Sequence, residues 1–165
     1  MKKDGYEIKI YPDYDYPSPL DWDMLGTFVH WHTRLDMGND RIDKPENQKE
    51  YDQLVKSFEG VVLPVYVPDH GQIQRQIGFI YVKAVDVRKE YKVERISLKL
   101  RETVKQLLTS EIEVWSDWIS GDVYSYEIVF NGEVIDSCGG FFGSDHKHLL
   151  EHAKYFVEHH KGIKL

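Results

Sequence analysis

Residues 121–143 read GDVYSYEIVFNGEVIDSCGGFFG and predict a complete two-stranded antiparallel hairpin. The side chains of residues 123–130 point alternately to the two faces of the strand, and the four side chains on one face are all aromatic or isoleucine. Asn131-Gly132 then supplies the two positive-φ residues that a type I′ turn requires, and residues 133–138 form the returning strand. The other strands of the protein are expected to assemble around this hairpin.

One pair of residues conflicts with the simplest register of this hairpin. A two-residue turn places Val129 opposite Val134, as expected for two apolar residues on one sheet face. It also places Glu127 opposite Asp136, and like charges in directly opposed positions destabilise a sheet. Either the register differs or a cation lies between the two carboxylates. We favour a basic side chain from the middle of the chain, which would form a structural salt bridge.

Length and composition indicate one globular domain that spans residues 1–165. The chain carries 28 acidic and 21 basic residues, a net charge of −7, and its single cysteine, Cys138, excludes an internal disulfide and a cysteine-based structural zinc site. No run approaches the roughly 20 apolar residues of a membrane span. The N-terminus also lacks the apolar stretch of a secretory signal. We therefore expect a cytoplasmic protein that has neither a cofactor nor membrane contact.

The spacing of apolar residues predicts an α+β domain with a mainly antiparallel sheet and about four helices packed largely on one face. The strands are expected near residues 6–11, 26–34, 61–67, 76–82, 122–130 and 133–139. The helices are expected near residues 48–58, 84–91, 95–119 and 145–160. Pro64 indicates an edge strand or a bulge, and Thr109-Ser110 could divide the long helix. Strand order and oligomeric state are not readable from the sequence.

The most unusual surface segment is YPDYDYPSPLDWD, residues 11–23, which we expect to be an extended loop, as we do residues 37–47. It interleaves acids with aromatic residues and contains no base. Such a segment can simply cover the edge of the core, or it can contact a basic partner. On the second interpretation the partner-binding residues are Asp13, Tyr14, Asp15, Tyr16, Asp21, Trp22, Asp23, Asp117 and Asp122.

A metal or small-ligand site is an alternative. His30 and His32 are two residues apart in a predicted strand, where both side chains would point to one side. Zinc prefers four ligands, so further groups would have to converge on this pair. The candidates are Asp69, His70, Cys138 and the pair His146 and His148. If Cys138 met a histidine the site could also be hydrolytic, but no motif of specific chemistry is present and we assign no catalytic residue.

Nucleic-acid binding is a second alternative. Charge is distributed unevenly, with −5 over residues 1–60, +4 over 61–110 and −6 over 111–165. A net-acidic chain repels nucleic acid, so any such binding would depend on the middle block alone. The basic residues expected on one face of a helix over 92–105 are Lys92, Arg95, Lys99, Arg101 and Lys105. A solvated helix face is the simpler interpretation of these residues.

Several segments in this order resemble a family of small acidic proteins encoded by bacteriophages and other mobile elements. They are SPLDWDMLGTFVHWHTRLDMG, LPVYVPDHG, IGFIYV, RKEY, SGDVYSYEI and DSCGGFFG. The resemblance spans residues 6–143 and implies a protein that acts in the cytoplasm of a bacterial host. Small acidic proteins from such genomes often bind a host protein, including defence nucleases with basic grooves.

We therefore expect an accessory protein that acts by protein–protein interaction through its acidic and aromatic surface. The expected partner is a host defence or nucleic-acid-processing protein, because an acidic surface complements a basic groove. The alternatives are the metal or small-ligand site and the basic helix described above.

Overall fold

The computed structural model describes residues 2–3, 5–32, 38–69 and 73–160, without the side chains of residues 2, 3, 68, 69, 73, 74 and 160. The chain divides into two compact units, unit 1 with residues 1–17 and 117–165, and unit 2 with residues 18–116. The predicted α+β class is confirmed, since four α-helices accompany two mainly antiparallel sheets in the described residues. The sequence predicts a single sheet, but the strands form two sheets of four strands each.

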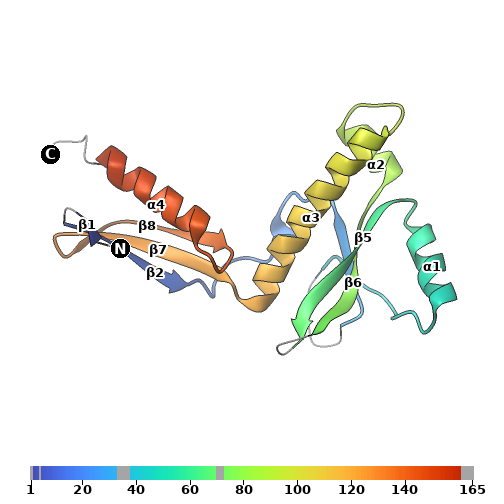
Figure 1. Ribbon diagram of the computed structural model, residues 1–165, viewed down its shortest axis with the longest axis horizontal. Helices are drawn as coiled ribbons and strands as arrows, with labels where there is room; N and C mark the ends of the chain where they lie inside the picture. The colour runs from blue at the N-terminus through green and yellow to red at the C-terminus, as the bar shows by residue number, and fades with distance from the viewer. Residues whose placement is uncertain (1, 4, 33–37, 70–72, 161–165) are drawn as a thin grey trace. The chain divides into compact units, whose positions relative to one another are not determined.

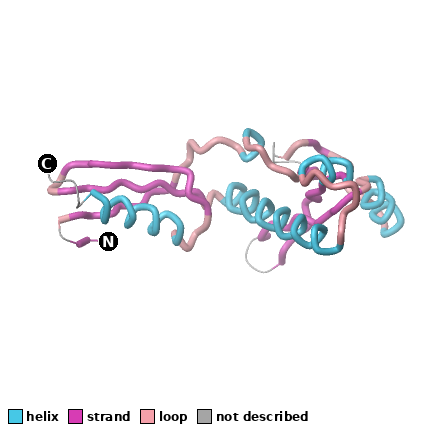
Figure 2. The backbone as a smooth tube through the Cα atoms, turned by 90° about the horizontal axis from the view of Figure 1, so that it is seen from above, coloured by secondary structure: helices cyan, strands magenta, loops and turns pink. Residues whose placement is uncertain are grey.

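Unit 1 is built on sheet A, in which the strand order is β1-β2-β7-β8 and every pair is antiparallel. Its strands are β1 (Lys2–Lys3), β2 (Tyr6–Pro12), β7 (Val123–Phe130) and β8 (Glu133–Phe142). Helix α4 (Lys147–His160) lies along one face of this sheet, as both views show (Figures 1 and 2). Leu149 and Ala153 of α4 pack against Ile8 and Ile128 and so form the core of the unit.

The predicted hairpin is confirmed at its turn and wrong in its register beyond it. Asn131 and Gly132 have φ values of 50° and 93°, as a type I′ turn requires, and Val129 faces Val134. A bulge at Ile135 then shifts the register, so that Asp136 faces Ile128 rather than Glu127. The shift moves the two carboxylates to opposite faces of the sheet, and no bridging base is needed.

Unit 2 is built on sheet B, in which the strand order is β4-β3-β6-β5. Its strands are β3 (Thr27–His30), β4 (Asp40–Arg41), β5 (Gly60–Asp69) and β6 (Ile73–Lys83). The antiparallel pairing that the sequence predicts for most of the strands is confirmed for β5 with β6. The edge position that Pro64 indicates is also confirmed, because β5 is the last strand of the sheet. The strand also carries an irregularity between Val65 and Tyr66.

Helices contact both faces of sheet B, although the sequence predicts that they lie largely on one. Phe79 of β6 contacts Tyr51 of α1 (Gln48–Ser57), with ring centroids 5.1 Å apart. Phe28, on the other face of the sheet, contacts Trp115 of α3 (Leu98–Ser120), also at 5.1 Å. The short helix α2 (Ala84–Glu90) follows β6 directly and packs near its end (Figure 1).

Several predicted boundaries need correction. Residues 11–23 are not wholly an extended loop, because Tyr11 and Pro12 belong to strand β2. In addition, Pro19–Asp21 forms one 3₁₀ turn with proline at its first position. The loop over residues 37–47 contains the short strand β4, which pairs with β3. Strand β3 ends at His30, so the described part of the predicted strand 26–34 is shorter than expected.

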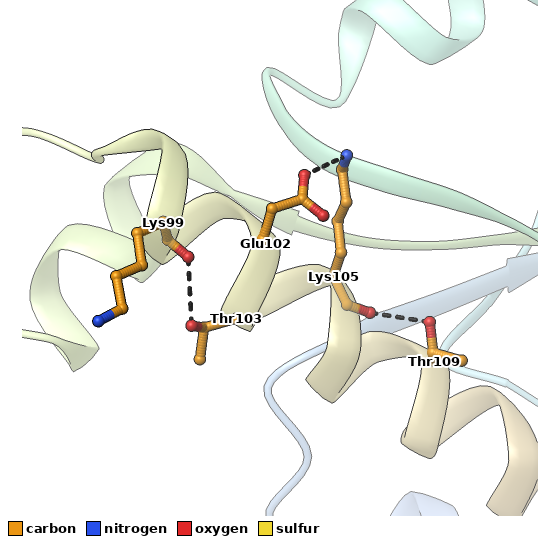
Figure 3. Close-up of polar contacts among 5 residues, drawn as sticks. All are labelled: Lys99, Glu102, Thr103, Lys105 and Thr109. Atoms are coloured by element: carbon orange, nitrogen blue, oxygen red, sulfur yellow. Dashed lines mark hydrogen bonds and ion pairs between the residues drawn. The ribbon is translucent and has the colours of Figure 1, made fainter.

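The long helix α3 is not divided at Thr109-Ser110. The hydroxyl of Thr109 donates to the carbonyl of Lys105 at 2.9 Å, and the hydroxyl of Ser110 donates to the carbonyl of Gln106 at 3.3 Å (Figure 3 draws the first of these bonds). Both hydroxyl groups are therefore satisfied inside the helix and do not compete with its backbone.

A buried carboxylate holds the start of β3 against α3. Glu111 is only 7% exposed, and its two carboxylate oxygens accept hydrogen bonds from the backbone N–H groups of Leu25 at 2.8 Å and Gly26 at 2.9 Å. Burial raises the pKa of Glu111, and the two hydrogen bonds oppose this effect only in part. A Cβ at Gly26 would lie 2.5 Å from this carboxylate, so glycine is required there.

We expect Glu111→Gln to lower the free energy of unfolding by about 1 to 3 kcal/mol at pH 7, because an amide can accept only one of the two N–H bonds. The raised pKa means that native Glu111 binds its proton more tightly than unfolded Glu111, so its contribution to stability falls as pH rises. The loss caused by Glu111→Gln should therefore be larger near pH 4 than at pH 7. Urea unfolding of both proteins at each pH measures this difference, and an equal loss at both pH values would contradict it.

Candidate partner-binding site

The first part of the acidic and aromatic segment is fixed onto sheet A at a glycine bulge in β8. Asp13 continues the pairing of β2 with β7, since its N–H donates to the carbonyl of Val123 at 2.8 Å. Its carboxylate accepts the N–H of Gly140 at 3.0 Å. Gly139 and Gly140 together face the single residue Ser125, and a Cβ at Gly139 would overlap the Asp13 carboxylate. The side chain of Asp13 is therefore a structural anchor.

Tyr16 provides a second anchor for the same loop. Its ring meets the ring of Phe142 edge to face, with centroids 5.3 Å apart and an interplanar angle of 80°. The ring also covers Gly140, where a Cβ would overlap it directly. Gly140 has a φ of 77°, which further favours glycine. The loop is thus held on both sides of Tyr14 and Asp15.

Tyr14 and Asp15 lie between these anchors and point into solvent. Tyr14 is 86% exposed, an unusual state for a large aromatic side chain, and Asp15 is also exposed. Because the backbone on either side is already held, little chain entropy would be lost when these two residues contact a partner. We define the presenting loop as residues 13–17.

The other predicted partner-binding residues are divided between the two units. Asp21 and Asp23 are exposed and Trp22 is half-buried, and all three belong to unit 2. Asp117 and Asp122 belong to unit 1 and are half-buried. Asp122 accepts a hydrogen bond from the hydroxyl of Tyr124 at 3.3 Å, which indicates a structural role.

Sequence reasoning missed two residues near the start of the presenting loop. Tyr11 is 41% exposed on the face of sheet A opposite α4, and its hydroxyl donates to Glu127 at 3.2 Å. Desolvation, assisted by the Glu127 carboxylate, raises the pKa of Tyr11 above its ordinary value. The sequence contained one indication of this contact. The predicted repulsion between Glu127 and Asp136 implied that Glu127 has a different partner.

The structure describes only some of the predicted metal ligands, and these are divided between the two units. His30 is buried and His32 lies just beyond the end of β3, whereas Cys138 belongs to unit 1 and packs beside the core under α4. The side chain of Asp69 and the whole of His70 lie outside the described residues. Among the described side chains, no three His, Cys, Asp or Glu groups are placed to hold one metal ion.

The basic residues of the middle block are not all on a helix. Helix α3 begins at Leu98, so Lys92 and Arg95 precede it, contrary to the prediction of a helix over 92–105. Lys105 forms a 2.8 Å ion pair with Glu102 one turn earlier (Figure 3). The basic residues therefore do not form one continuous helix face, because two of them precede α3 and Glu102 lies beside Lys105. Both features argue against phosphate binding by these residues.

Comparisons with family models, curated proteins and solved structures gave no match. Over the described part of the chain, no helix has both the length and the apolar character to cross a membrane. The presenting loop, with its exposed Tyr14, is the most distinctive surface of the described chain.

Proposed function

We propose that this protein acts by binding another protein through the presenting loop, with Tyr14 and Asp15 as its central contacts. The observation that carries the proposal is the 86% exposure of Tyr14 between two anchored neighbours. Tyrosine supplies a large contact area with few rotatable bonds, which is why it is common at the centres of interfaces.

A basic partner surface fits the charge of the unit that carries the loop. Unit 1 has 12 acidic and 7 basic residues, a net charge of −5, whereas unit 2 has 16 acidic and 14 basic residues. An acidic surface is attracted to a lysine- or arginine-rich one and associates with it faster at low ionic strength. The acids nearest Tyr14 in the chain are Asp13 and Asp15, and Asp15 is exposed.

The partner we propose is a bacterial host protein of a defence or nucleic-acid-processing system, which this protein would inhibit by occupying a basic groove. The resemblance to phage-encoded acidic proteins supports this choice, as does the acidic character of unit 1. A basic groove built for nucleic acid accepts a carboxylate-rich protein surface through the same lysine and arginine side chains.

The test is affinity capture from a nuclease-treated bacterial host lysate, with the partner then purified and its affinity measured. We expect Tyr14→Ala to weaken binding about 10- to 30-fold, the loss typical of a central tyrosine contact. Asp15→Lys should weaken it further at low salt. Neither change should alter thermal stability much, because both side chains are exposed.

Tyr155→Ala is the matched control, because Tyr155 is also an exposed tyrosine of unit 1, at 62%, but lies on α4. It should bind the partner as the native protein does. If Tyr14→Ala and Tyr155→Ala bind equally well, the presenting loop is not the contact surface. If no captured protein binds in a salt-dependent way, the proposed basic partner is wrong.

A further inference from the structure

A chain of polar contacts links α4 to sheet A. Tyr126 of β7 is only 1% exposed, and its hydroxyl lies 3.1 Å from an oxygen of Asp136 on β8. The same hydroxyl lies 2.9 Å from Nδ1 of His152 on α4. The ring of Phe141 flanks His152, with centroids 5.5 Å apart. Three elements therefore hold one imidazole ring in place.

The number of available protons decides the direction of these bonds. Tyr126 has one hydroxyl proton, and it donates this proton in its hydrogen bond to Asp136. The hydroxyl oxygen of Tyr126 is then left to accept a hydrogen bond from Nδ1–H of His152. A neutral His152 thus carries its proton on Nδ1 and its lone pair on Nε2, and this atom is a free acceptor on an exposed residue.

A second histidine lies one helical turn before His152. His148 precedes it by four residues on α4, so the two side chains are neighbours on one helix face. The His148 side chain is 80% exposed and its Nδ1 lies 3.8 Å from Glu151, a loose contact that leaves the ring free to turn. Two histidines at this spacing on a helix are a recurrent pair of metal ligands.

We propose that His148 and His152 bind one divalent ion of the late first-row transition metals, with water in the remaining coordination positions. Metal-binding histidines commonly donate their second ring N–H to an oxygen that fixes the tautomer, and Tyr126, held by Asp136, supplies that oxygen here. Because no third ligand converges among the described residues, the site is open, and no reaction is assigned to it.

Two properties follow from this ligand set. Affinity should rise from Co²⁺ to Ni²⁺ to Cu²⁺ and fall again at Zn²⁺, the usual order for nitrogen ligands. Binding should also weaken on acidification, because each imidazole must be neutral to donate its lone pair.

The test uses the untagged full chain, since a polyhistidine tag would bind the same ions. Calorimetric titration with Ni²⁺ and Cu²⁺ should show one site, and both His148→Ala and His152→Ala should weaken it at least tenfold. His159→Ala is the matched control, because His159 also lies on α4 with Nδ1 bonded to a carbonyl oxygen, that of Tyr155, at 2.8 Å. It should retain native affinity.

Asp136→Asn tests the supporting contacts, and we expect it to weaken binding roughly 10-fold or more without removing either ligand. The electron spin resonance spectrum of bound Cu²⁺ should show two nitrogen ligands in the native protein and one after His148→Ala. If His148→Ala binds Ni²⁺ and Cu²⁺ as tightly as the native chain, the proposal is wrong. The same holds if the native chain binds neither ion at millimolar concentration. His148 is exposed, so its replacement does not threaten the fold.

Discussion

Replacing Gly140 with alanine is expected to lower the free energy of unfolding by about 2 to 4 kcal/mol and to weaken partner binding. Part of the loss comes from the backbone, because Gly140 has a φ of 77°, in a region that penalises a Cβ. The larger part comes from the new methyl group, which would overlap the ring of Tyr16 and force it away from Phe142. Urea unfolding and partner titration measure the two effects.

Gly121→Ala separates the two causes of this loss. Gly121 has nearly the same φ, 74°, but no atom lies within 4 Å of the position that its Cβ would take. Its replacement should therefore cost only the backbone part, about 1 to 2 kcal/mol, and leave partner binding intact. In the double variant Tyr16→Ala with Gly140→Ala, the steric part should disappear, so the two losses should not add. Equal losses for Gly140→Ala and Gly121→Ala would show that Tyr16 does not anchor the loop.

Trp115→Ala is expected to cause the largest loss of stability, about 3 to 5 kcal/mol. Trp115 is 2% exposed and contacts Phe28 across the interface between α3 and sheet B. Truncation would leave a large cavity beneath the sheet, and the backbone of two regular elements cannot collapse to fill it. Thermal and urea unfolding, followed by circular dichroism, measure the change.

Leu98→Ala is the control for this prediction on the same helix. Leu98 is 86% exposed, and leucine and alanine are both good helix formers, so the free energy of unfolding should change by less than about 0.5 kcal/mol. A loss below about 1 kcal/mol for Trp115→Ala would mean that α3 does not pack on sheet B in the way described.

Local sequence signals were sufficient for the four α-helices and for six of the eight strands among the described residues, but for the pairing only of strands that follow one another in the chain. The type I′ turn follows from Asn131-Gly132 alone, because few other residues tolerate the required dihedral angles. The conflict between Glu127 and Asp136 allowed a change of register, but the bulge could not be placed at Ile135, since an isoleucine there fits an ordinary alternating strand. The division into two sheets likewise depends on contacts between segments far apart in the chain, such as β2 with β7.

In the candidate site, the sequence likewise does not distinguish anchoring side chains from exposed ones. In the repeat Asp13-Tyr14-Asp15-Tyr16 the two tyrosines are equivalent by composition and by spacing. Gly140 distinguishes them, because its missing side chain makes room for Tyr16 and leaves Tyr14 in solvent. Sequence reasoning could therefore identify the segment as a surface of interest, whereas only the structure separates its anchors from its exposed contacts.

The most direct test of the proposed function is site-specific photo-crosslinking in bacterial host cells. A benzophenone amino acid is placed at position 14 in one variant and at position 155 in another, both native tyrosine positions that are exposed in unit 1. We expect position 14 to crosslink to one basic host protein and position 155 to give no such product. Crosslinking of that protein from position 155, or no product from position 14 in cells that contain the partner, would contradict binding through the presenting loop.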